Sequence, residues 1–231
     1  MSTSTRPQQT ERSMLRLMFV LTFVTGMIDA IGYLGLDRVF AGNMTGNVVI
    51  LGLGLAGADR LPVLGPATAL GGFLLGAALA GRVLRRSDRG RWTTETTAVL
   101  MGGVTLLGAV AVLLFLGESL PPQVSTPLGA FLLATAMGAQ AATARRLAVQ
   151  EVTTVVVTST LTGLAADSRL GGGGSRLAFR RAGAVLCLTA GAAAGALLLL
   201  LHAGLGVAVS AALTLVVAVW GHLSLRRPAQ A

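Results

Sequence analysis

Six apolar stretches, each close to twenty residues long, limit the folds open to this sequence more than any other feature. About 20 apolar residues in a helix are enough to cross a hydrocarbon core of roughly 30 Å. Charged residues make up 12% of the sequence, against roughly 25% in soluble domains. The alternating strands that a membrane β-barrel needs do not occur. We therefore predict an all-α, polytopic transmembrane helix bundle with spans at 14–36, 61–84, 96–116, 126–144, 177–201 and 205–225.

The predicted spans form a single membrane domain, residues 14–225. Residues 1–13 are polar and predict a disordered cytoplasmic tail, and residues 226–231 predict a second, short cytoplasmic tail. The first apolar stretch is too long for a signal-peptide core and lacks a small-residue cleavage site, so we interpret it as the first membrane helix.

For two further segments, 39–57 and 152–168, length alone does not decide whether they cross the membrane. In the first, the continuous apolar run covers 48–58, which makes about 16 Å of helix, roughly half of the hydrocarbon thickness. The second is rich in Thr. We interpret both as re-entrant or broken half-helices, which enter the membrane and leave by the same face.

Arginine placement supports this interpretation, because short Arg-rich loops stay in the cytoplasm. The 18 basic residues are all Arg. With a cytoplasmic N-terminus and both short segments re-entrant, only Arg38 and Arg60 lie outside. If both segments span, the arginines divide almost evenly between the two sides. An external N-terminus, with 39–57 spanning and 152–168 re-entrant, also keeps most of them inside and stays open.

The two halves of the sequence, 14–117 and 126–225, share a pattern. Each contains a helix with Gly, a doubtful segment with a Thr-Gly pair, a helix with Gly residues four apart, and a final apolar helix. Three spans in a half is an odd number, so the halves are predicted to form an inverted repeat, as in many transporters. Glycines at this spacing let membrane helices pack closely. The paired features are Thr45-Gly46 with Thr162-Gly163, and Gly72 and Gly76 with Gly191 and Gly195.

Asp29 is the acidic residue that lies deepest in an apolar stretch. A carboxylate there costs about 2.5–3.5 kcal/mol on insertion scales unless it meets a partner, water or a proton. One interpretation makes it a proton- or cation-coupling group, or a polar wall of a solute path. The other makes it a cap that accepts hydrogen bonds from free backbone N–H groups of the broken helix. The two are compatible.

The sequence NMTGN contains the remaining candidates of the first half: Asn43, Thr45, Gly46 and Asn47. A half-helix that begins inside a membrane leaves up to four N–H groups without intrahelical partners, and side chains, water or a ligand must meet them. Glycine lets a backbone or a solute approach, and a helix N-terminus suits an anionic or carbonyl-bearing ligand. The alternative is a break that satisfies itself and binds nothing.

Second-half candidates for the opposite wall of such a path are Thr160, Thr162, Gly163 and Gln140. Thr side chains also bond back to carbonyls of their own helix, which is the more common arrangement. Gln140 occupies the place equivalent to Asp29, so a site between the halves would be asymmetric.

Other chemistry finds little support in the sequence. Cys187 lies alone in an apolar run, which excludes a disulfide framework and favours a small hydrophobic packing role. His202 and His222 lie near predicted helix ends without carboxylates at ligand spacing. We expect no metal, no cofactor and no enzymatic activity. The net charge of +9 reflects arginines at span ends rather than a nucleic-acid interface.

Several motifs together resemble the YoaK-like family of small polytopic bacterial membrane proteins, which is classed as a domain of unknown function. They are GMIDAIGYL, then VFAGNMTGNVVILG, then a Gly-rich helix, and later TSTLTG. The resemblance covers roughly residues 14–225. Leu164 follows the second Thr-Gly pair, where the first half has Asn47, so the second half departs from the motif of the first. The most specific positions are Asp29, Phe40, Asn43, Thr45, Gly46 and Asn47.

The resemblance implies a bacterial inner-membrane protein with about six spans and brings no established activity. From the residues, we expect a small-solute transporter or channel with a midplane site at the broken helix, and both termini in the cytoplasm. The alternative is a non-transporting protein that binds a partner or acts in assembly or stress response, in which the polar break is structural. Expected partners are the lipid bilayer and a small molecule or ion. The sequence leaves a homo-oligomer open.

Overall fold

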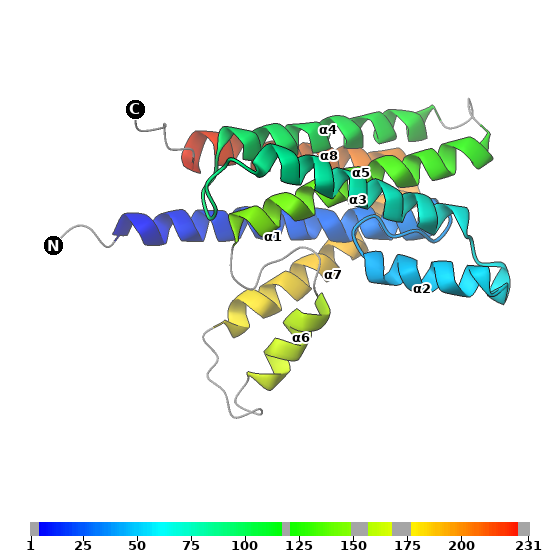
Figure 1. Ribbon diagram of the computed structural model, residues 1–231, viewed down its shortest axis with the longest axis horizontal. Coiled ribbons are helices and arrows are strands. Elements are labelled where there is room, and N and C mark those ends of the chain that lie inside the picture. Colours follow the sequence, from blue (N-terminus) through cyan, green and yellow to red (C-terminus); the bar gives the residue numbers. More distant parts are fainter. Residues whose placement is uncertain (1–4, 117–120, 149–156, 168–176, 226–231) are drawn as a thin grey trace.

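The computed structural model describes residues 5–116, 121–148, 157–167 and 177–225, and their regular elements are all helical (Figure 1). The all-α prediction is confirmed for this part of the chain. The helices are α1 (Thr5–Gly35), α2 (Met44–Leu55), the short 3-10 helix η1 (Ala58–Arg60), α3 (Leu64–Leu84), α4 (Thr94–Phe115), α5 (Pro122–Leu147), α6 (Val157–Ala166), α7 (Ala178–Leu201) and α8 (Ala203–Leu225).

Five of the described helices, α1, α3, α4, α7 and α8, are long and apolar enough to cross a membrane. The sixth predicted span, 126–144, lies within α5, which has 26 residues but is not one of the five. Its polar side chains Thr135, Gln140 and Thr143 are buried. These polar side chains of α5 therefore face the inside of the bundle. They lower the hydropathy of the helix without exposing polar groups to lipid, so hydropathy alone does not identify α5 as a span.

α1 begins earlier than the sequence predicts. Its first residue is Thr5, so residues 5–13 are helical rather than a disordered tail. The segment contains Arg, Gln and Glu, which are good helix formers and let the helix extend beyond its apolar part. Residues 1–4, the tail 226–231, and residues 152–156 and 168 of the segment 152–168 lie outside the described residues.

The helices of the two halves pack mainly on each other. α1 packs on α7 and α8, while α5 packs on α3 and α4. The short helices α2 and α6 lie on α3 and α7 respectively, and α4 pairs with α8. Exchanging the first half (α1–α4) for the second (α5–α8) leaves this set of neighbours unchanged.

Glycines make the closest of these contacts possible. A Cβ added at any of the four glycines of the two predicted packing motifs would overlap the backbone of the facing helix. The side chain is absent where two backbones meet, as small-residue packing in membranes requires. The contacts are Gly72 and Gly76 with the carbonyls of Phe131 and Thr135, and Gly191 and Gly195 with those of Phe23 and Met27.

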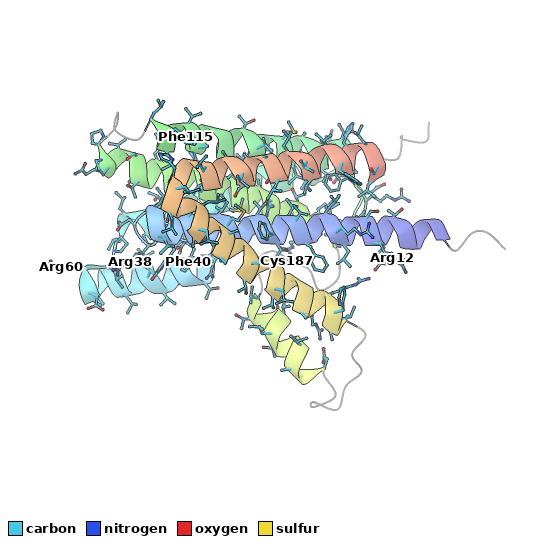
Figure 2. The ribbon with its side chains drawn as sticks, turned by 180° about the vertical axis from the view of Figure 1, so that it is seen from behind. Arg12, Arg38, Phe40, Arg60, Phe115 and Cys187 are labelled. Atoms are coloured by element: carbon cyan, nitrogen blue, oxygen red, sulfur yellow. The ribbon has the colours of Figure 1, made fainter. Side chains whose placement is uncertain are left out.

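Arginines lie near both ends of the helix bundle. Arg12 lies near one end, and Arg38 and Arg60 lie near the other, on the side of Phe115 (Figure 2). The beginning of α1 and the end of α8 are at the same end of the bundle (Figure 1). At that end Arg146 of α5 donates to the carbonyls of Arg85 and Ser87, which fixes the connection between α3 and α4.

Candidate functional site

The chain reverses direction directly after α1. Asp37 and Arg38 have φ values of 60° and 58°, left-handed backbone that turns the chain back. The Val39 amide then donates to the Gly32 carbonyl at 3.3 Å. A Cβ at Gly32 would lie only 2.5 Å from the Val39 carbonyl oxygen, so this glycine is needed for the approach. Residues 39–43, the returning segment, therefore run back beside α1.

Asp29 binds the far end of the returning segment. Its Oδ1 accepts hydrogen bonds from the backbone N–H groups of Ala41 at 2.9 Å and Gly42 at 2.7 Å. Gly42 also lies against Thr25, one turn earlier in α1. Asp29 is six residues before Gly35, the last residue of α1, so these bonds form about 9 Å along the axis from the helix end. Asp29 therefore accepts from free backbone N–H groups, as a cap does, but these belong to the returning segment and not to α2 itself.

Two asparagines complete the start of α2. Asn47 is fully buried, and its amide pairs with both backbone groups of Phe40: Oδ1 accepts from the N–H at 2.9 Å, and Nδ2 donates to the carbonyl at 2.6 Å. Asn43 caps α2, since its Oδ1 accepts from the Gly46 N–H at 3.2 Å. Side chains thus satisfy backbone groups that the break leaves free.

The two remaining residues of NMTGN differ from the asparagines. Gly46 lies under the ring of Phe40, where a Cβ would come within 2.7 Å of the ring carbons. That ring also stacks on Tyr33 of α1, with 5.0 Å between ring centroids. The side chain of Thr45 is exposed. Gly46 therefore allows the Phe40 ring to pack closely. The Thr45 side chain lies beside the break on the exposed surface.

The Asn47→Asp and Asn43→Asp variants are expected to differ. At position 47 a carboxylate loses the donor to the Phe40 carbonyl and faces that oxygen in a buried place, which costs about 1–3 kcal/mol. At position 43 Asp caps a helix as well as Asn does, so stability should be unchanged. Thermal unfolding of both variants in the same detergent makes the comparison, and equal stability would show that the Asn47–Phe40 pair does not hold the turn.

Gln140 lies on α5 and faces α1 rather than α2. Its Nε2 donates to the Leu21 carbonyl at 3.2 Å and to Thr25 Oγ1 at 3.0 Å. Because Thr25 also touches Gly42, it connects Gln140 with the returning segment. The structure thus brings Gln140 close to the Asp29 cluster through one intervening side chain.

The second-half threonines do not join this cluster. Thr162 donates to the carbonyl of Thr158 in its own helix at 2.9 Å, and Thr160 is buried. Among the described residues α6 packs on α7, without contacts to α1 or α2. The expectation that Thr160, Thr162 and Gly163 form the opposite wall of a path at Asp29 therefore finds no contact that supports it.

Arg181 of α7 explains where α6 lies. Its Nη1 donates to the Gly163 carbonyl and to Asp167 Oδ2, both at 2.6 Å, and a Cβ at Gly163 would meet the guanidinium group. The second Thr-Gly pair thus lies against the guanidinium group of Arg181.

Sequence reasoning missed Thr25 and Arg181. Thr25 had a signal, because it precedes Asp29 by four residues and so shares its helix face. Arg181 had none beyond its place at the start of an apolar span.

Comparison with known proteins agrees with the motifs. Residues 17–220 match the family described as "Protein of unknown function (DUF1275)". The chain belongs to the DUF1275 family. It is also 32% identical over 151 residues to "UPF0700 transmembrane protein YoaK" of Bacillus subtilis (strain 168). That match covers 65% of this chain and 65% of the relative, so the chain spans just under two thirds of the relative's length. No solved structure matches.

The resemblance inferred from the motifs is thereby confirmed. The matched DUF1275 region contains α1 from Leu17 onward, the returning segment, and every described helix up to most of α8. Together with the five long apolar helices, the transmembrane relative shows a multi-pass membrane protein of this family.

Proposed function

We propose that the protein is a small-solute transporter or channel whose path passes Asp29 and the break before α2. One observation carries the proposal: Arg38, before the break, and Arg60, after α2, lie at the same end of the bundle (Figure 2). α2 has 12 residues, about 18 Å of helix, too short for a hydrocarbon core of roughly 30 Å. We therefore infer that α2 is a re-entrant half-helix. Non-helical backbone at membrane depth is tolerated where protein buries it or where it lines a water-filled cavity.

The neighbour pattern of the helices supports the same proposal. Among the α-helices, each packing relation has a counterpart when the two halves are exchanged, as expected for an inverted repeat. Transporters built from such repeats bind their substrates at interrupted helices between the halves. In this proposal the site lies about 9 Å below the outer end of α1, nearer to the outer surface than a midplane site.

Arginine placement gives the orientation within this proposal. The end of the bundle with Arg12 and the connection fixed by Arg146 faces the cytoplasm, and the end with Arg38 and Arg60 faces outward. α5 then crosses as a sixth span, with its polar side chains inside the bundle. In a bacterium this places the protein in the inner membrane, with both termini in the cytoplasm.

The chemistry of the break favours a proton or a cation as the coupled species. Asp29 has a carboxylate at membrane depth, and a group of this kind in a transmembrane segment commonly serves ion or proton movement. Its Oδ1 already accepts from Ala41 and Gly42. Protonation or cation binding at Asp29 would compete with these bonds. Binding of the coupled ion at Asp29 would therefore be linked to the position of the returning segment.

A second candidate is a non-transporting membrane protein, in which the break is structural. The observation in its favour is that Asp29, Asn43 and Asn47 already satisfy backbone groups of the returning segment and of α2. A self-satisfied break needs no ligand to be stable.

Accessibility labelling separates the two candidates. In a Cys187→Ala background, which removes the single cysteine, Thr45→Cys is expected to react with a charged, water-soluble thiol reagent in intact membranes. A solute path requires water at this exposed position. The readout is the fraction of protein modified, measured by mass spectrometry.

Val49→Cys is the matched control. Val49 is also exposed and lies one turn further along the same face of α2, so a path that ends at the break leaves it against lipid and slow to react. Protection of both positions would favour the structural break. Equal and rapid labelling of both would place α2 outside the membrane and remove the re-entrant helix from the proposal.

A further inference from the structure

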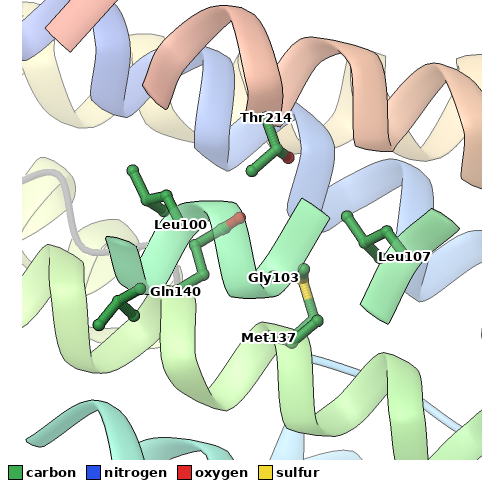
Figure 3. A pocket seen from close by; sticks show the side chains of 8 residues that line it. Leu100, Gly103, Leu107, Met137, Gln140 and Thr214 are labelled. Carbon is green, nitrogen blue, oxygen red and sulfur yellow. The ribbon is translucent and has the colours of Figure 1, made fainter. Parts of the chain in front are cut away.

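A small cavity lies inside the bundle between α4, α5 and α8, away from α2 (Figure 3). Its wall includes Leu100, Gly103 and Leu107 of α4, Met137 of α5 and Thr214 of α8, together with Gln140. Its volume is about 10 Å³, the space that one water molecule needs.

Gln140 presents its amide oxygen to this cavity. The side of the amide that faces α1 meets two acceptors, because Thr25 Oγ1 uses its own hydrogen to bond the Leu21 carbonyl at 2.9 Å. Only the NH2 group can donate to both Leu21 and Thr25. The orientation of the amide is therefore fixed, and Oε1 must point away from α1, toward the cavity (Figure 3).

That oxygen is an unmatched acceptor. Gln140 is 3% exposed, and its Oε1 has no hydrogen-bond partner among the residues that the structure describes. A buried polar group left without a partner costs about 1–3 kcal/mol. Thr214, on the opposite wall, donates its hydroxyl hydrogen to the Ser210 carbonyl at 2.8 Å, so it too offers the cavity lone pairs only.

Gly103 leaves the cavity open. It is buried, yet a Cβ added there would meet no atom within 4 Å. Buried glycines elsewhere in the bundle, such as Gly76, lie directly against a backbone. At Gly103 the missing side chain therefore creates space rather than a contact between helices.

We propose that this cavity binds one water molecule, which donates a hydrogen bond to Gln140 Oε1. The site offers acceptors and apolar walls, so its ligand must be a donor. None of its described lining residues is a carboxylate, so a cation would be buried without a counter-charge. A neutral donor of this size in a membrane protein is water. The site is separate from the proposed solute path and stands whether or not a solute crosses the membrane.

The experiment is X-ray hydroxyl-radical footprinting of the full chain in detergent, with mass spectrometry of methionine oxidation. Radiolysis of a bound water forms the radical in place, so Met137 on the cavity wall is expected to oxidise severalfold faster than Met18 and Met27. All three methionines are buried to a similar degree, so bulk water should reach them equally poorly. Methionine sulfoxide is the product counted.

Two variants should remove the signal. Gly103→Ala fills the cavity without a steric clash, and Gln140→Leu removes the acceptor while keeping a side chain of similar size. Both are expected to lower Met137 oxidation to the rate of Met18. Gly102→Ala is the control, because the added Cβ lies on the exposed face of the same helix. In this variant Met137 should be oxidised at the same rate as in the parent protein.

The outcomes are distinct. Slow oxidation of Met137 in the parent protein, equal to that of Met18 and Met27, would overturn the proposal. Fast oxidation that persists in both Gly103→Ala and Gln140→Leu would also overturn it, since the radicals would then come from elsewhere. Thermal unfolding of each variant checks that the fold is retained, and Gly103→Ala carries the test if Gln140→Leu does not fold.

Discussion

Asp29→Ala is expected to destabilise the protein by roughly 1–3 kcal/mol for each backbone N–H that loses its acceptor. The two groups are those of Ala41 and Gly42, both bonded to Oδ1. Asp29→Asn keeps an oxygen at this position and should retain most of the stability. The free energy of unfolding in detergent measures the difference, and a fully stable Asp29→Ala variant would show that the carboxylate does not hold the returning segment.

The same pair of variants tests transport. Asp29→Asn removes the ionisable group but not the acceptor, so in the proposed function it abolishes flux while the protein stays folded. Proteoliposomes are assayed for proton flux with an internal pH-sensitive dye, and for glycerol and urea flux by light scattering. Asp37→Asn is the control, since Asp37 is an exposed carboxylate in the turn outside the break. Flux that Asp29→Asn leaves unchanged would exclude Asp29 from the mechanism.

Gly76→Ala is expected to have a comparable effect on stability at a different place. The new Cβ would overlap the backbone of Thr135 in α5, and forcing extra volume into a packed interface costs about 1–3 kcal/mol, occasionally more. A larger residue such as valine should prevent the α3–α5 contact altogether. Thermal unfolding of Gly76→Ala in detergent measures the effect.

Gly71→Ala is the matched control for that change. Gly71 lies in the same helix and is exposed, and a Cβ there would meet no atom within 4 Å. Alanine in place of a helical glycine adds up to about 1 kcal/mol of helix propensity, so this variant should be neutral or slightly more stable. Equal destabilisation by both changes would mean that α3 and α5 do not approach closely at Gly76.

Local features of the sequence predicted much of this structure. The apolar runs predicted the long helices because burial in lipid depends on composition over about twenty residues. The cluster of Asn and Gly before α2 predicted the break, because these residue types satisfy or expose backbone at helix ends. For Asp29 the sequence left two interpretations open, a cap of the broken helix or a group in a solute path, because a carboxylate at such depth needs partners.

Contacts between distant residues were beyond sequence reasoning. Nothing in the sequence around Arg181 indicates that its guanidinium would bond Gly163, because that contact depends on how α6 and α7 pack. The orientation of Gln140 likewise depends on Leu21 and Thr25 of α1. The start of α1 was placed too late because tertiary packing and helix propagation extend helices past their apolar segments.

The cross-half pairing of the helices has a consequence for biogenesis. Of the described helices α1 is synthesised before the others, yet its main partners, α7 and α8, are synthesised after all of them. The glycine-lined face of α7 closes on α1 only after the helices between them have been inserted. Assembly is thus a late event dominated by contacts between residues far apart in the chain, a type of topology that folds slowly. Until α7 and α8 have been synthesised, lipid or an insertion chaperone must cover the surface of α1 that they later occupy.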